Sequence, residues 1–145
     1  MKVRECMCDT VCTCKPETTI SEVAKMMSEH HIGCVPVCDH GESIVGILTD
    51  RDIILRAIAC GKEASNTKVS DIMTTDTTCC REDDEITTVS NLMAKEQVRR
   101  IPVTENGKLV GILTLGDFAK NQQINHEFVG KTSECICGYN DKNAE

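Results

Sequence analysis

The sequence predicts an α/β protein of the α+β kind, in which one small structural unit is used twice. Two observations indicate this. The chain repeats itself at a nearly constant offset, and both copies show the same order of helical and strand-like patterns. At 145 residues, the chain suits one domain or two small units that share a core. With 40% hydrophobic and 27% charged residues, its composition is that of an ordinary globular protein.

The repeat appears when the chain is laid on itself with an offset of 66 residues, which places Met7 on Met73. Further pairs at this offset are Cys14 with Cys80, Ile20 with Ile86, Val23 with Val89, Met27 with Met93, and Pro36 with Pro102. One extra residue near position 42 of the first copy then moves the offset to 65. After it, residues 45–49 and 110–114 are identical. Chance does not produce this agreement.

Each copy begins with a strand-like lead-in, followed by a helical pattern. Apolar side chains recur at helical spacing at Ile20, Val23, Ala24 and Met27, and again at Ile86, Val89 and Met93. Thr19, followed three residues later by Glu22, predicts a capping box at the start of the first helix. The pair Asp83 and Asp84 precedes the second helix in the same way.

Two short strands and a second helix follow in each copy. The turn signals at residues 40–41 and 106–107 each separate two strand-like runs. The runs contain Val35 and Val37 and then residues 43–48 in the first copy, and Ile101 and Val103 and then residues 108–113 in the second. Thr49 and Thr114 open the next helix, which we expect to end at Gly61 in the first copy.

These patterns give a β-α-β-β-α unit used twice. We expect repeat one at residues 1–58, a polar linker at 59–68, repeat two at 69–121, and a flexible tail without apolar periodicity at 122–145. A copy of roughly 55 residues could hardly bury a core alone. The two copies are therefore expected to pack about a pseudo-twofold axis and to share their sheet faces.

Charge and hydropathy exclude several classes of protein. A net charge of −7 argues against binding to nucleic acid, because affinity for a polyanion comes from clustered lysine and arginine. The basic points Arg51, Arg56, Arg99 and Arg100 suit a compact anion instead. No apolar run approaches the roughly 18 residues that cross a bilayer, and the N-terminal residues lack the pattern of a secretory signal. We therefore expect a cytoplasmic protein that binds no membrane.

The chain is rich in cysteine, with eleven residues of this type. An odd number in a protein without an export signal argues against a disulfide scaffold, so reduced thiols that fill space are expected. Cys12, Cys14, Cys34, Cys38 and Cys80 fall in apparent strands, where such fillers fit. The Cys-x-Cys pairs at 6/8, 12/14 and 135/137 leave metal binding or thiol redox sensing open as an alternative, although structural zinc usually requires a wider spacing.

Two ordered pairs of motifs resemble the tandem cystathionine-β-synthase (CBS) repeats, which are also called Bateman modules. The matching stretches are residues 30–37 and 46–52 in the first copy, and residues 98–103 and 111–117 in the second. Each motif alone is weak, but two copies at matched spacing are strong. The resemblance covers residues 3–120.

The element Gly-x-x-Thr-x-x-Asp in each copy has a physical rationale. Gly46 lets another backbone approach the strand closely, Thr49 caps the next helix, and Asp52 lies one turn in. Capping alone is an alternative role for this threonine and aspartate. The resemblance implies that Asp52, and its counterpart Asp117, hold the hydroxyls of a ribose.

The resemblance also implies that residues of both copies build each cleft. The Asp52 cleft is expected to use Ile47, Thr49, Arg51 and His31 of repeat one, with Thr78, Val98 and Arg99 of repeat two. The Asp117 cleft is expected to use Ile112 and Thr114, with Cys12 and Ile32 of repeat one. With no tryptophan, an aliphatic slot must receive the adenine. The basic residues near Asp52 predict that its cleft binds a nucleotide more tightly than the Asp117 cleft.

The predicted function is that of a regulatory module that senses AMP, ADP or ATP, requires no cofactor and signals to an unknown protein target in trans. No nucleophile, base and orienting group stand together in the sequence, so no catalysis is expected. The resemblance implies a homodimer through helical faces, for which Met26, Met27 and Met93 offer apolar side chains. The alternatives are a metal- or redox-responsive CBS protein, or a protein that binds another adenosyl ligand such as S-adenosylmethionine.

Overall fold

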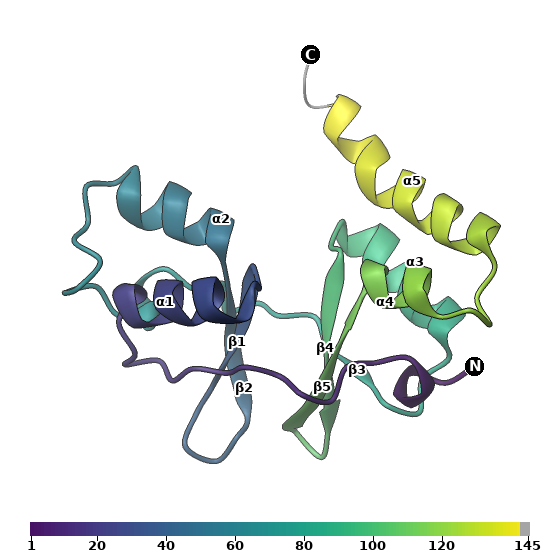
Figure 1. Ribbon diagram of the computed structural model, residues 1–145, viewed down its shortest axis with the longest axis horizontal. Coiled ribbons are helices and arrows are strands. Elements are labelled where there is room, and N and C mark those ends of the chain that lie inside the picture. The colour runs from purple at the N-terminus through teal and green to yellow at the C-terminus, as the bar shows by residue number, and fades with distance from the viewer. Residues whose placement is uncertain (143–145) are drawn as a thin grey trace. The chain divides into compact units, whose positions relative to one another are not determined.

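The computed structural model describes residues 1–142 and divides them into two compact units. The first-repeat unit contains Val11–Thr77 and Gly107–Leu109, and the second-repeat unit contains Met1–Thr10, Thr78–Asn106 and the chain from Val110 onward. Both units repeat one order of elements, a short lead-in, a helix, two strands and a helix, as the sequence predicts (Figure 1). Within the described part of the chain, no helix is long and apolar enough to cross a membrane.

The first-repeat unit contains a two-stranded sheet with helices packed against it. Its elements are α1 (Ile20–His30), β1 (Cys34–Cys38), β2 (Ile44–Thr49), α2 (Asp50–Asp52), the π-helical segment η2 (Ile53–Ile58) that continues α2, and the 3₁₀ turn η3 (Val69–Asp71). Strands β1 and β2 are antiparallel, and Cys34 lies opposite Thr49. The lead-in joins the sheet through a parallel bridge between Cys14 and Val37.

The second-repeat unit has the same plan with one more helix. Its elements are the 3₁₀ turn η1 (Val3–Glu5), β3 (Cys80–Arg81), α3 (Ile86–Glu96), β4 (Arg100–Glu105), β5 (Lys108–Thr114), α4 (Leu115–Lys120) and α5 (His126–Lys142). The strand order is β3-β4-β5, with β3 parallel to β4. The predicted lead-in strand has only two residues in this copy, and in the first copy it is reduced to the single bridge at Cys14.

Each unit encloses its own apolar core. The first-repeat core is built from Cys14, Ile20, Val23, Met27, Val35, Val37, Leu48, Ile53, Ala57, Val69 and Ile72. The second-repeat core is built from Val3, Cys80, Ile86, Val89, Met93, Ile101, Val103, Leu113, Phe118, Ile124 and Ile136. The predicted helical positions face these cores, with one exception: Ala24 is exposed. The predicted capping box also forms, because the Thr19 amide donates to Glu22 (3.0 Å) and the Glu22 amide donates to Thr19 (3.3 Å).

Each sequence copy starts with a short turn whose valine is buried in the core formed mainly by the other copy. Val3, at the start of the first copy, is fully buried in the second-repeat core, and Val69, at the start of the second copy, is fully buried in the first-repeat core. The linker residues next to Val69 are also held in place. The Ile20 amide donates to the Thr67 carbonyl (3.0 Å), and the Ser21 amide donates to the Ala64 carbonyl (3.1 Å).

Helix α5 occupies most of the segment for which the sequence predicted a flexible tail. In Figure 1, α5 (yellow) runs beside α3 and α4 of its own unit. Its apolar residues are few but lie on one side. Ile136 is buried, and the rings of Phe128 and Phe118 meet edge to face with centroids 5.6 Å apart. Because the sequence contains only this sparse apolar pattern, it does not predict the helix. Residues 143–145 of the predicted tail lie outside the described residues.

The exposed apolar surface differs from the one expected for a dimer. Met27 and Met93 are buried in the two cores, so the expectation that they supply an interface is wrong. The exposed large apolar side chains of the described residues are instead Ile54 (56% exposed), Leu55 (49%) and Ile58 (64%), all on η2. At the corresponding positions after the repeat offset of 65, the second copy has Ala119, Lys120 and Gln123.

Candidate functional site

The carboxylate of Asp52 stands where β2 ends and α2 begins. The Thr49 amide donates to Asp52 Oδ2 (3.0 Å), and the Asp52 amide donates to Thr49 Oγ1 (3.1 Å). These two bonds form the capping box that the Thr-x-x-Asp spacing predicts as an alternative role for these residues. A carboxylate has about four acceptor positions on its two oxygens, so one capping bond leaves acceptors for a ligand.

Asp117 repeats this arrangement between β5 and α4. The Thr114 amide and the Thr114 hydroxyl both donate to Asp117 Oδ2, each at 2.8 Å, and the Asp117 amide donates to Thr114 Oγ1 (3.1 Å). The two aspartates are therefore held in equivalent places by equivalent caps. The caps differ in one bond, since only Thr114 donates its hydroxyl to the aspartate.

Both strands that lead to these aspartates have a second chain segment against their backbone. Ile47 exchanges two backbone hydrogen bonds with Thr74 (2.9 and 3.0 Å). A Cβ on Gly46 would lie 2.7 Å from Met73 Sδ and 2.9 Å from the Thr74 carbonyl oxygen. Only glycine fits such an approach, as the sequence predicts for this position.

The second copy repeats this close approach. Ile112 exchanges two backbone hydrogen bonds with Cys8, both at 2.9 Å. A Cβ on Gly111 would lie 2.9 Å from both the Cys8 carbonyl oxygen and Met7 Sδ. The lead-in backbone is thus fixed next to Ile112, as it is next to Ile47.

In each repeat, the first strand starts shortly after the C-terminus of the first helix, and this terminus has the same conformation in both repeats. His31 ends α1 in a left-handed conformation with φ of 54°, and the Asp50 amide donates to the Gly33 carbonyl (3.0 Å). In the second repeat, Gln97 ends α3 with φ of 56°, and the Leu115 amide donates to the Arg99 carbonyl (2.9 Å). Residues that follow the first helix are therefore held next to the start of the second.

The structure divides the predicted site residues between the two units. Cys12, His31, Ile32, Ile47, Thr49, Arg51 and Asp52 belong to the first-repeat unit, and Thr78, Val98, Arg99, Ile112, Thr114 and Asp117 belong to the second. The side chains of His31, Arg51 and Arg99 are exposed, while the other ten residues are half-buried, which suits groups that both hold the fold and meet a ligand. The assignment of residues from both copies to one cleft stays a prediction.

Arg56 is a neighbour of Asp52 that the predicted site did not include. Its Nε lies 3.7 Å from Asp52 Oδ1, and its Nη1 donates to the Ile72 carbonyl (3.1 Å) and to Thr74 Oγ1 (3.3 Å). The sequence contains a signal for this contact, because positions i and i+4 of a helix lie on one face. Arg56 thus links the site carboxylate to the lead-in segment that pairs with Ile47.

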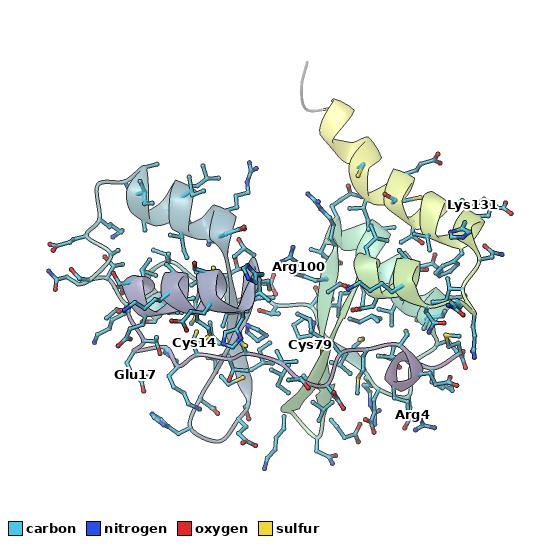
Figure 2. All side chains as sticks on the ribbon, in the orientation of Figure 1. Arg4, Cys14, Glu17, Cys79, Arg100 and Lys131 are labelled. Carbon is cyan, nitrogen blue, oxygen red and sulfur yellow. The ribbon has the colours of Figure 1, made fainter. Side chains whose placement is uncertain are left out.

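The cysteines of the cores have poorly ionised thiols. Burial raises the pKa of Cys14 and of Cys80 to about 12 and that of Cys6 to about 11. Cys14 lies next to β1, under α1 (Figure 2). Since the thiolate is the form that binds metals and attacks disulfides, these thiols are poor ligands at neutral pH. Among the described residues, no group of three or more His, Cys, Asp or Glu side chains is placed to hold a metal ion.

The fold and both site motifs agree with a known protein family. The model of the CBS domain matches residues 3–58 and 69–123. The chain belongs to the CBS family. It is 41% identical to the CBS domain-containing protein YhcV of Bacillus subtilis (strain 168) over 123 residues. This alignment covers 85% of this chain and 86% of YhcV.

The solved structures that are similar to this chain include three with bound ligands or metal ions. A structure of Hypoxic Response Protein I with two coordinated zinc ions has a TM-score of 0.77 at 30% identity and covers 83% of this chain and 98% of its own. The CBS domain pair of protein MJ0100, in complex with 5′-methylthioadenosine and S-adenosyl-L-methionine, has a TM-score of 0.74 at 28% identity, with the same coverage. CBSX2 in complex with AMP has a TM-score of 0.70 at 26% identity and covers 80% of this chain and 91% of its own.

Proposed function

We propose that this CBS pair is a regulatory module that binds an adenine nucleotide, AMP, ADP or ATP, and that catalyses no reaction. The observation that carries the proposal is the pair of half-buried carboxylates, Asp52 and Asp117, fixed by their caps at the ends of β2 and β5. The complex of the similar CBSX2 with AMP supports a nucleotide as the ligand.

The chemistry of each half-site suits a nucleoside. A ribose presents two adjacent hydroxyl donors, and a carboxylate that keeps free acceptors binds such a diol with charge-assisted hydrogen bonds. Ile32 and Ile47 in the first-repeat unit, and Val98 and Ile112 in the second, offer half-buried aliphatic surface for an adenine ring.

Basic side chains that could bind phosphate groups lie near the Asp52 carboxylate. The exposed Arg51 directly precedes Asp52, and the corresponding residue before Asp117 is Gly116. We therefore propose that the Asp52 half-site binds phosphorylated ligands more tightly. Arg99 and His31 are proposed as further phosphate contacts.

Another adenosyl ligand is the second candidate. S-adenosylmethionine has the same ribose and adenine, and the similar MJ0100 pair binds it. Its sulfonium cation would gain nothing from Arg51, which favours the phosphate-bearing ligands. The metal- or redox-responsive alternative draws on the zinc-containing relative, but the raised pKa values of the buried thiols of Cys14 and Cys80 disfavour these two as ligands.

We further propose that the protein acts in the cytoplasm as a homodimer that signals to a separate protein target. The three exposed apolar side chains of η2 supply the self-association surface in place of the buried methionines. Light scattering should then report a dimer for the wild type and a monomer for Ile54→Glu. A monomeric wild type would contradict the dimer while leaving the ligand site untouched.

Isothermal titration with AMP, ATP, S-adenosylmethionine and GMP tests the proposed ligand class. The expected result is saturable binding of AMP or ATP, weaker binding of S-adenosylmethionine, and still weaker binding of GMP. Asp52→Asn should weaken AMP binding more than Asp117→Asn does. Equal loss in both variants would contradict the unequal half-sites, and absence of binding by every adenosyl compound would contradict the proposed function.

A further inference from the structure

The Asp52 carboxylate has a charged neighbour that orients it. Its side chain is 15% exposed, Oδ2 accepts the Thr49 amide, and Oδ1 faces the guanidinium of Arg56 at 3.7 Å. Arg56 is itself anchored, since Nη1 donates to the Ile72 carbonyl and to Thr74 Oγ1. Both carboxylate oxygens are thus restrained, and each has one interaction within the protein.

Asp117 lacks this neighbour. At the repeat offset of 65, the residue that corresponds to Arg56 is Asn121, whose Nδ2 lies 3.7 Å from Met1 Sδ. Oδ2 of Asp117 accepts two hydrogen bonds from Thr114, and among the described residues no group pairs with Oδ1. Oδ2 of Asp117 is therefore filled, and Oδ1 has no partner of its own among the described residues.

The distribution of free acceptors determines how each carboxylate can meet a ribose. Asp52 keeps about one acceptor position on each oxygen, and the adjacent hydroxyls of a ribose can each take one. Asp117 offers its acceptors on Oδ1 alone unless the Thr114 hydroxyl turns away. A group already held in its bound orientation binds more tightly, because less side-chain freedom is lost on binding.

We propose that Arg56 is a positioning residue that prepares Asp52 for a ligand with two adjacent hydroxyls. The Asp52 half-site then discriminates a ribose from a 2′-deoxyribose more strongly than the Asp117 half-site does. This inference rests on the proposed function, because it concerns the same carboxylate. It adds a residue and a ligand feature that decide selectivity.

The experiment compares AMP with 2′-deoxy-AMP by isothermal titration of the full chain. An Asp117→Asn background leaves Asp52 as the reporting carboxylate. We expect 2′-deoxy-AMP to bind about tenfold more weakly than AMP when Arg56 is present, as for the loss of one hydrogen bond to a charged group. Arg56→Asn introduces the residue type found at the corresponding position of the second repeat. In this variant, the ratio of the dissociation constants of 2′-deoxy-AMP and AMP should fall to about threefold or less. Arg56→Lys retains the charge without the planar fork and should give an intermediate ratio.

Two further variants separate positioning from a general structural role. Asn121→Arg in an Asp52→Asn background should raise the ratio at the Asp117 half-site. Arg56→Asn combined with Asp52→Asn should bind AMP no more weakly than Asp52→Asn alone, because Arg56 acts through that carboxylate. A ratio that is unchanged in Arg56→Asn, or an added loss in the double variant, would overturn the role of Arg56. Failure of wild-type protein to bind AMP would overturn the proposed function as well, so the two failures are distinguishable.

Discussion

Replacing Gly46 with alanine probes the contact between β2 and the lead-in segment. The added Cβ would lie 2.7 Å from Met73 Sδ and 2.9 Å from the Thr74 carbonyl oxygen. The thioether can move, but the carbonyl belongs to a backbone that exchanges two hydrogen bonds with Ile47. Thr74 must therefore shift, and both bonds lengthen.

The cost follows from overpacking and weakened hydrogen bonds. Extra methyl groups in a filled site cost about 1–3 kcal/mol, and each weakened hydrogen bond adds about 1 kcal/mol. For a chain of 145 residues, we expect the unfolding midpoint to fall by roughly 3 °C for each kcal/mol. Because Ile47 lies in the proposed adenine slot, AMP affinity should fall as well.

Thermal and urea unfolding, followed by circular dichroism, measures this effect. Gly130→Ala in α5 is the matched control, since a Cβ there meets no atom within 4 Å and alanine favours a helix by about 0.5–1 kcal/mol. Gly111→Ala should reproduce the loss in the second repeat. A Gly46→Ala protein as stable as wild type would refute the reasoning that close backbone approach requires this glycine.

Two further predictions concern stability. Above pH 9 the thiols of Cys14 and Cys80 ionise in the unfolded chain but keep their protons in the fold, where their pKa is about 12. The folded state then binds more protons, so the free energy of unfolding should fall as the pH rises from about 8.5 to 12, by up to about 1.4 kcal/mol per pH unit for each thiol. Urea unfolding of Cys14→Ala at pH 8 and 10 should show a shallower loss, and an equal loss would count against burial as the cause. Ile136→Ala should destabilise the protein by about 2–4 kcal/mol in the same assay, because it opens a cavity between α5 and the second-repeat core. A change below 0.5 kcal/mol would show that α5 is not part of that core.

Features that depend on local spacing could be predicted from the sequence. The duplicated unit and the caps at Thr19 and Thr49 were predicted correctly, because each depends on residues within a few positions of one another. The glycine at 46 was predicted for its close backbone approach, although its neighbours, Met73 and Thr74, were not.

Features that depend on distant packing could not be predicted in this way. The burial of Val3 and Val69 in opposite cores follows from tertiary packing, which the repeat pattern does not contain. Helix α5 has few apolar residues, and they indicate a packed helix only when their contacts with Phe118 and its neighbours are known. Arg56 was predicted only as a basic residue that suits a compact anion, because two of its partners, Ile72 and Thr74, are distant along the chain.

Titration of the Asp52→Asn/Asp117→Asn double variant with AMP tests the central claim most directly. Asparagine preserves the size of both side chains but removes the negative charge that the proposed ribose contact requires. Asp71→Asn is the matched control, because Asp71 also accepts a capping amide, that of Lys68 (3.2 Å), and lies outside the proposed site. We predict that the double variant remains folded and loses AMP binding, while the control binds AMP as the wild type does. Undiminished AMP binding by a folded double variant would contradict the claim that these two carboxylates hold the nucleotide.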